Sequence, residues 1–234
     1  TKDGKKDLQN GANLNVFSGI FDGNNHTVTI PEGGLPLFGY VQNTRIRNLN
    51  IYGTKIAGYG LVNNFEGVGL SGTAVEIDNV TLKSGSSTLK AGLLGANKTM
   101  SPYAGCSSSF EATVRNCTIE KDVVIGYDKD MNEIGAIAGR MQGTVENCVS
   151  YATVYGSSYV GGIIGTRDNA MGNCSVIGCK FYGTVEASSE VAGGIAGGGY
   201  DNSTALNGCK ITINSCSSEG SITGSDKVGG ILGG

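Results

Sequence analysis

The sequence predicts an all-β fold, a parallel β-helix (β-solenoid) in which short strands wind into stacked coils. The first observation is a short apolar run closed by glycines, which recurs at 159–165 (YVGGIIG), 190–197 (EVAGGIAG) and 227–233 (KVGGILG). Looser copies lie at 134–139 (IGAIAG) and 91–95 (AGLLG). A motif that returns along the chain is typical of repeat architectures. The second observation is that no stretch of useful length has the 3.6-residue period of a helix.

A second repeated landmark opens a short strand in each copy of the repeat. Its members are Asn48-Leu49, Asn79-Val80, Asn116-Cys117, Asn147-Cys148, Gly178-Cys179 and Ser215-Cys216. Their first residues are 31, 37, 31, 31 and 37 positions apart. Each landmark is followed by a short stretch of alternating apolar and polar residues, then by a glycine, and then by the glycine-rich run. One copy therefore holds three short strands and three turns. This is the content of one coil, and we therefore expect about six coils.

Stacking of the coils at about 4.8 Å places equivalent residues above one another. One inward column is then Leu49, Val80, Cys117, Cys148, Cys179 and Cys216. Because Leu and Val share this column, its sulfurs are expected to be buried hydrophobic groups. Asparagines preceding the column would stack at a corner, where Asn tolerates turn geometry and its amides can bond along the stack. The paired glycines at 161–162, 193–194 and 229–230 would allow a tight corner that a Cβ would block.

Outside the repeats, residues 1–16 predict a lead-in, and the β-helix is expected to occupy 17–234. Val28 and Ile30 alternate with threonines, which predicts a strand with one buried face. Residues 35–41 predict the next short strand. Because the chain starts at Thr1 and stops inside a repeat copy, we expect a piece of a longer protein.

Composition excludes several classes of function. The net charge of −3 gives no electrostatic reason to expect a nucleic acid or an anionic membrane as partner. No apolar run approaches the ~18 residues that a membrane span needs. The only histidine, His26, follows a turn, so a multi-histidine metal site is not expected. No cofactor is expected.

The segments 147–165 (NCVSYATVYGSSYVGGIIG) and 17–26 (FSGIFDGNNH) carry a resemblance to a known family. The chain resembles the GLUG-repeat proteins of bacterial surfaces and secretions, most closely over 115–234. The resemblance implies a right-handed parallel β-helix in large exported proteins, including adhesins and some peptidases in which the repeats are accessory. It transfers no catalytic residue, and it does not explain the long inserts at 96–114 and 198–210.

Seven cysteines raise the questions of disulfides and metals. Buried free thiols are the favoured interpretation of the column. Cys106, Cys174 and Cys209 are expected in inserts, and a Cys174–Cys209 disulfide across coils is an alternative. No CxxC motif is present, so zinc is not expected.

The segment 128–133 (DKDMNE) is a candidate surface metal site. Asp128, Asp130 and Asn132 have the alternating oxygens that begin a calcium loop. An EF-hand is excluded, because its sixth and twelfth positions would be Glu133 and Gly139. A solvated turn is the favoured interpretation, with a looser calcium site as the alternative.

Residues that follow the glycine-rich runs are expected to share one corner. The candidate ligand-binding residues there are Lys98, Arg140, Arg167 and Tyr200. Asp168 and Asp201, one coil apart, are the candidate catalytic carboxylates, because a separation of ~5–9 Å suits glycoside hydrolysis. Arg140 and Arg167 could grip an acidic sugar. A solvated polar rim would have the same composition.

These features favour a non-catalytic repeat domain of an exported bacterial adhesin-like protein, at the cell surface or outside the cell. It would act as a stiff spacer and as an interaction surface for a host or cell-wall glycan or a surface protein. The alternatives are a glycoside hydrolase or polysaccharide lyase, and an accessory domain of a secreted peptidase. An uncapped last coil would expose strand edges, so end-to-end self-association is expected.

Overall fold

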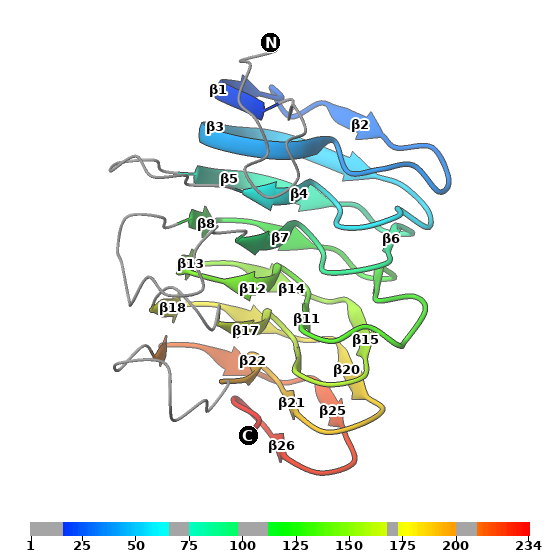
Figure 1. The fold of residues 1–234 in the computed structure, drawn as a ribbon, viewed down its shortest axis with the longest axis vertical. Coiled ribbons are helices and arrows are strands. Elements are labelled where there is room, and N and C mark those ends of the chain that lie inside the picture. Colours follow the sequence, from blue (N-terminus) through cyan, green and yellow to red (C-terminus); the bar gives the residue numbers. More distant parts are fainter. Residues whose placement is uncertain (1–15, 66–74, 98–111, 168–172, 200–209) are drawn as a thin grey trace, which may run out of the picture.

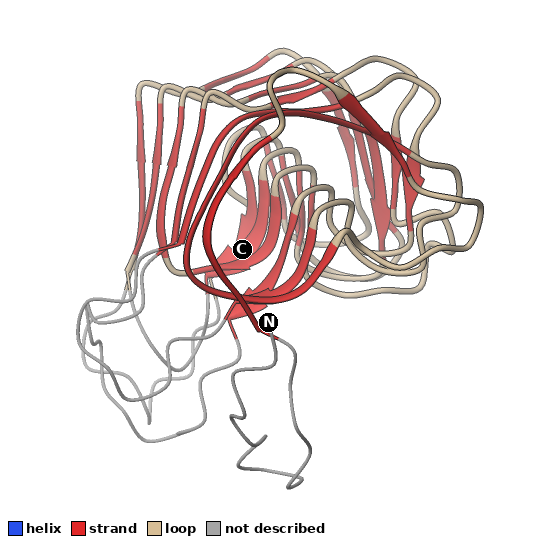
Figure 2. Cartoon of the chain, turned by 90° about the horizontal axis from the view of Figure 1, so that it is seen from above, coloured by secondary structure: helices blue, strands red, loops and turns tan. Residues whose placement is uncertain are grey.

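The computed structural model describes residues 16–65, 75–97, 112–167, 173–199 and 210–234. These residues form an all-β structure without a helix, and thus without a helix that could cross a membrane. The coils follow one another from the N-terminal to the C-terminal end (Figure 1). Seen along this direction, the strands of successive coils lie over one another (Figure 2). The arrangement fits the predicted β-solenoid class. Except for Val16, the predicted lead-in lies outside the described residues.

The strands belong to three sheets, and every described pairing between named strands is parallel. The large sheet contains β1 (Val16–Asp22), β2 (Thr27–Thr29), β3 (Phe38–Tyr52), β4 (Val62–Phe65), β5 (Val75–Leu82), β7 (Leu94–Asn97), β8 (Ala112–Arg115), β9 (Thr118–Ile119), β12 (Ala138–Met141), β13 (Gly143–Glu146), β14 (Val149–Ser150), β17 (Ile164–Arg167), β18 (Cys174–Ile177), β19 (Lys180–Phe181), β22 (Ala196–Gly198), β23 (Ile211–Asn214) and β24 (Ser217–Ser218). The second sheet contains β6 (Ser87–Thr88), β10 (Val124–Ile125), β15 (Thr153–Gly156), β20 (Thr184–Ala187) and β25 (Ser221–Thr223). The third contains β11 (Ile134–Gly135), β16 (Val160–Gly161), β21 (Ala192–Gly193) and β26 (Val228–Gly229).

Neighbouring coils pair in parallel and in a defined register, which shifts once, between Phe17 and Gly19 of β1. In the large sheet Val114 pairs with Val145, and Val145 with Val176. All three side chains are buried, so they form one column of the common core. A single coil has no partner for these apolar side chains, and stacking supplies one on each side. The core therefore runs continuously along the stack.

The glycine-rich runs let two stretches of backbone pack directly against each other. A Cβ built on Gly193 would lie 2.0 Å from the carbonyl oxygen of Ala196 and 2.6 Å from the Gly233 nitrogen. A Cβ on Gly161 would meet the carbonyl oxygen of Ile164 at 1.9 Å. Real Cβ atoms do not approach this closely, so the constraint is close approach and not an unusual φ. The prediction that a Cβ would be blocked is confirmed at Gly161, Gly162, Gly193, Gly194 and Gly229 but not at Gly230, where a Cβ would meet nothing within 4 Å.

The second corner is formed by residues in the left-handed backbone conformation. Their φ angles are 52° at Asn48, 54° at Asn79, 54° at Asn116, 51° at Asn147, 63° at Gly178 and 53° at Ser215. Asn is among the few side chains that tolerate this region, and Gly adopts it freely. The predicted amide ladder is partial. Asn79 donates to Asn48 at 2.9 Å, whereas Asn116 donates to the carboxylate of Asp78 at 2.8 Å.

The predicted cysteine column is present in the core, and the register explains why it contains sulfur. Cys117, Cys148 and Cys179 are fully buried, and Cys216 is half-buried. The Cys148 N–H donates to the Cys179 sulfur, and the Cys179 N–H to the Cys216 sulfur, both at 3.4 Å. A buried backbone N–H needs an acceptor. The thiol of one coil therefore satisfies a donor of the preceding coil, which Leu or Val cannot do.

Two sequence-based expectations are wrong in detail. The strand expected at 35–41 begins at Phe38 as the start of β3, which continues to Tyr52 because residues 44–47 and 49–52 pair with β1, β2 or β5. Cys174 does not lie in an insert. It opens β18 and is fully buried, in register with Gly143 and Ile211.

Gly194 and Gly230 occupy the same column and provide a matched test of the glycine corner. A Cβ on Gly194 would meet the Gly230 carbonyl oxygen at 2.1 Å, whereas a Cβ on Gly230 would meet nothing within 4 Å. We predict that Gly194→Ala lowers the free energy of unfolding by about 1–3 kcal/mol or more, and that Gly230→Ala changes it by less than about 1 kcal/mol. Urea unfolding followed by circular dichroism measures both, and equal effects would contradict the close-approach explanation.

The thiol acceptor role predicts a difference between two buried cysteines. Cys179→Val removes the acceptor of the Cys148 N–H, which should cost about 1–3 kcal/mol of stability because a buried donor is left without a partner. Cys174→Val is the control, since within the described chain the Cys174 sulfur has no hydrogen bond. It should cost about 1 kcal/mol or less. Chemical unfolding compares the two variants, and a Cys179→Val protein as stable as wild type would exclude this role.

Candidate functional site

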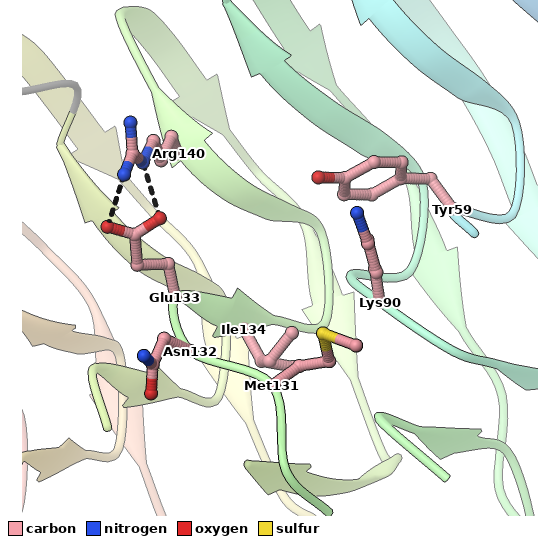
Figure 3. A pocket seen from close by; sticks show the side chains of 7 residues that line it. All are labelled: Tyr59, Lys90, Met131, Asn132, Glu133, Ile134 and Arg140. Carbon is pink, nitrogen blue, oxygen red and sulfur yellow. Dashed lines mark hydrogen bonds and ion pairs between the residues drawn. The ribbon is translucent and has the colours of Figure 1, made fainter. Parts of the chain in front are cut away.

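The candidate site is a small cavity of about 130 Å³ beside the third sheet, which we call the Lys90–Arg140 pocket. It is lined by Tyr59, Lys90, Met131, Asn132, Glu133, Ile134 and Arg140 (Figure 3). Tyr59 precedes β4, and Lys90 lies between β6 and β7. Met131 to Glu133 lead into β11, and Arg140 lies on β12. Three successive coils therefore contribute to the pocket.

One wall of the pocket is an ion pair between Arg140 and Glu133. The Arg140 Nη2 donates to Glu133 Oε1 at 2.7 Å, and Nε donates to Oε2, so the contact is bidentate. The Glu133 side chain is 15% exposed and that of Arg140 is 39% exposed. Glu133 has a left-handed φ of 61°, and its N–H donates to the Ser158 carbonyl at 2.9 Å. The neighbouring coil thus fixes the backbone at Glu133, and the Glu133 carboxylate orients the guanidinium.

The opposite wall is formed by Lys90 and Tyr59. The Lys90 ammonium lies 5.6 Å from the centre of the Tyr59 ring, within the range of a cation–π contact. A Cβ on Gly95 would lie 2.8 Å from Tyr59 Cε2, so the absence of a side chain at Gly95 makes room for the ring. Within the described chain no carboxylate pairs with Lys90. Since Arg140 and Glu133 cancel, the pocket carries about one positive charge.

Tyr159 lies in the same environment, one coil beyond Glu133. Burial and the carboxylates of Glu190 and Glu133 raise the pKa of Tyr159. The Tyr159 phenol therefore stays protonated at neutral pH. It is not an additional anion beside the pocket.

The predicted calcium segment forms a turn at the edge of the pocket. Asn132 Oδ1 accepts the Ser158 N–H at 3.1 Å, and Asp128 accepts the Asp130 N–H at 3.4 Å. Lys129 lies in the same segment, and its ammonium is 4.0 Å from the centre of the Tyr155 ring. Backbone groups therefore use oxygens that a metal would need. In the part of the chain that the structure describes, no group of three His, Cys, Asp or Glu residues could hold a metal ion.

Only part of the predicted row after the glycine-rich runs can be located. Lys98, Asp168, Tyr200 and Asp201 lie outside the described residues. Arg140 pairs with Thr166, and Met141 pairs with Arg167. Arg140 and Arg167 therefore lie on neighbouring paired strands, one residue apart in register, because Arg140 is the first residue after its glycine and Arg167 the second after its own.

Sequence reasoning missed Tyr59, Lys90 and Glu133 as members of a site. Each of them directly precedes a short apolar run that contains glycine. These runs begin at Gly60, Ala91 and Ile134. The candidates predicted from the sequence are instead the residues that follow these runs. A comparison of the positions before the runs would have placed the three side chains on one flank of the stack.

A second, open hollow of about 300 Å³ lies by Lys121, Asp122, Tyr151, Thr153 and Tyr182. The two tyrosine rings are stacked, with centres 5.2 Å apart and planes inclined by 16°. Lys121 lies 5.9 Å above the Tyr151 ring. The ring faces that a sugar would need are thus partly covered by the tyrosines and Lys121. This hollow is a weaker candidate than the Lys90–Arg140 pocket.

The cysteines of the described chain are free thiols, namely Cys117, Cys148, Cys174, Cys179 and Cys216. Cys106 and Cys209 lie outside the described residues. Burial raises the pKa of Cys174 to about 12, and hydrogen bonding to Cys148 together with burial raises the pKa of Cys179 to about 12. Both thiols are therefore protonated and unreactive at neutral pH, as suits core groups.

Comparison with known proteins gives a likeness of fold. No protein-family model matches the chain, and no curated protein matches it. The crystal structure of a putative immunoglobulin A1 protease from Bacteroides ovatus is similar, with a TM-score of 0.55 and 16% sequence identity. The match covers 91% of this chain and 68% of that chain. At this identity, the similarity establishes a common fold and no more.

Proposed function

We propose that this chain is a non-catalytic repeat domain of an exported bacterial protein. In this proposal a right-handed β-helix of about six coils acts as a stiff spacer and presents a surface to glycans. The GLUG-repeat resemblance and an extracellular or cell-surface location belong to the same proposal. The observation that carries it is the parallel pairing of each described coil with the next, around one continuous core.

The geometry of the stack supports the spacer role. Residues 143–167 have parallel partners in the preceding coil and in the following coil for each of their strands. Bending the stack would break several of these pairings and open the core. A rigid rod of this kind suits the projection of a neighbouring domain or ligand surface away from its anchor.

The chemistry of the Lys90–Arg140 pocket supports binding over hydrolysis. Glycoside hydrolysis by the common mechanisms needs two carboxylates facing one bond. Among the described residues that line the pocket, Glu133 is the one carboxylate, and Arg140 holds it in a bidentate ion pair. A glycoside hydrolase or lyase that uses Asp168 and Asp201 is the first alternative, and those residues lie outside the described chain.

An accessory domain beside a secreted peptidase is the second alternative. The fold likeness to the Bacteroides ovatus protein supports it, because that protein is named a protease and shares this architecture over 68% of its chain. A spacer and an accessory domain require the same physical property, which is a stiff stack without a catalytic centre of its own. Exposed Val228, Ile231 and Leu232 on the last coil fit the self-association that we also propose.

A glycan-array screen with mass analysis of the products tests the non-catalytic proposal. The full chain is compared with Asp168→Ala/Asp201→Ala and with Asp122→Ala/Asp226→Ala, which removes two exposed carboxylates elsewhere. We predict that none of the three proteins shortens any glycan, and that the two double variants bind the array alike. Cleavage by the wild type that only Asp168→Ala/Asp201→Ala abolishes would contradict the proposal and establish a carbohydrate-active enzyme.

A further inference from the structure

We propose that the Lys90–Arg140 pocket binds the acidic group of an anionic polysaccharide, with Lys90 as the principal cation. The inference rests on the glycan-binding part of the proposed function and names the ligand class. Figure 3 shows the Lys90 ammonium beside the Tyr59 ring on one side of the pocket. The Arg140–Glu133 pair lies on the other side, and the space between them is free for a ligand group.

Charge favours an anion in this space. The Lys90 ammonium has three N–H donors, and within the described chain it contacts an aromatic ring, which accepts weakly. Arg140 is already oriented by Glu133, so it does not have to lose side-chain freedom on binding. A carboxylate or sulfate would add charge-assisted hydrogen bonds, which are about twice as strong as neutral ones.

The size and lining of the pocket favour a sugar over a larger anion. A volume of about 130 Å³ holds only a few water molecules, since one occupies about 30 Å³ in the liquid. One acidic group and the edge of a pyranose ring fit this space. The Asn132 amide is a polar group for ring hydroxyls, and Met131 and Ile134 offer apolar surface for the ring carbons.

Glu133 limits the affinity and sets the selectivity. Its carboxylate repels an incoming anion, so the ligand group is expected to lie nearer to Lys90 than to Glu133. A single exposed contact of this kind gives a dissociation constant on the order of 1 mM. A polymer that presents its acidic groups repeatedly gains avidity from several copies of the protein. The site therefore suits a repeating polysaccharide.

Methionine methyl NMR gives a local test in the full 234-residue chain. Protein with ¹³C-labelled methionine methyl groups is titrated with a galacturonate trimer, its methyl-esterified form and a sulfated disaccharide. Met131 lies in the pocket and reports binding there, and its signal is assigned with Met131→Leu. Met141 is fully buried and is the internal control. The variants are Lys90→Gln and Lys121→Gln, which removes a lysine that also lies over a tyrosine ring, outside the pocket.

We expect galacturonate to shift the Met131 signal and the neutral ester to do so at least tenfold more weakly. Lys90→Gln should weaken galacturonate binding about tenfold or more, while Lys121→Gln should not change it. A response to the sulfated sugar alone would assign the same site to sulfated polysaccharides. Equal binding of the galacturonate trimer and its methyl-esterified form would overturn the inference, as would galacturonate binding that Lys90→Gln does not weaken. Both outcomes would leave the spacer proposal intact. Shortening of the trimer would instead contradict the non-catalytic proposal. The absence of any Met131 shift would overturn the inference.

Discussion

Direct packing of backbone against backbone at the glycine-rich runs is the constraint on which the rest of this structure depends. At Gly161, Gly193 and Gly229 the nearest atoms to a hypothetical Cβ are main-chain oxygens about 2 Å away. The chain can therefore reverse direction within a few residues and still close the coil around its core. Larger side chains would force the third sheet away from the large sheet, and the columns of neighbouring coils would lose their register.

The remaining interactions follow from this closed coil. Left-handed residues at the opposite corner turn the chain, and the next residue points into the core, where valines, leucines and thiols form columns. Ion pairs between coils, such as that of Arg47 with Asp22 at 2.8 Å, lie on the outer surface. Exposed pairs of this kind contribute about 0–1 kcal/mol each. Stability therefore comes from the shared core and the inter-coil hydrogen bonds, and the outer surface is free to carry ligands.

The sequence predicted the columns well because each column repeats the same residue type at a nearly constant spacing. Asn116 and Asn147, for example, each predict a corner, and the cysteine that follows each of them is predicted to point into the core. The site could not be predicted in this way, because Tyr59, Lys90, Glu133 and Arg140 differ from one coil to the next and meet only after the coils have stacked. Glu133 illustrates the limit, since nothing in its own coil indicates that Lys90 and Tyr59 of the two preceding coils line the same pocket.

Native-state hydrogen exchange tests most directly whether the stack is one stiff, cooperative unit. The amides of Glu120, Tyr151 and Tyr182 occupy one column and donate to the carbonyls of Leu82, Ile119 and Ser150 in the preceding coils. We predict that these three amides exchange through a common opening with the same free energy, equal to that of global unfolding. Markedly different opening free energies for the three amides would show that the coils open separately and that the stack is not one cooperative unit.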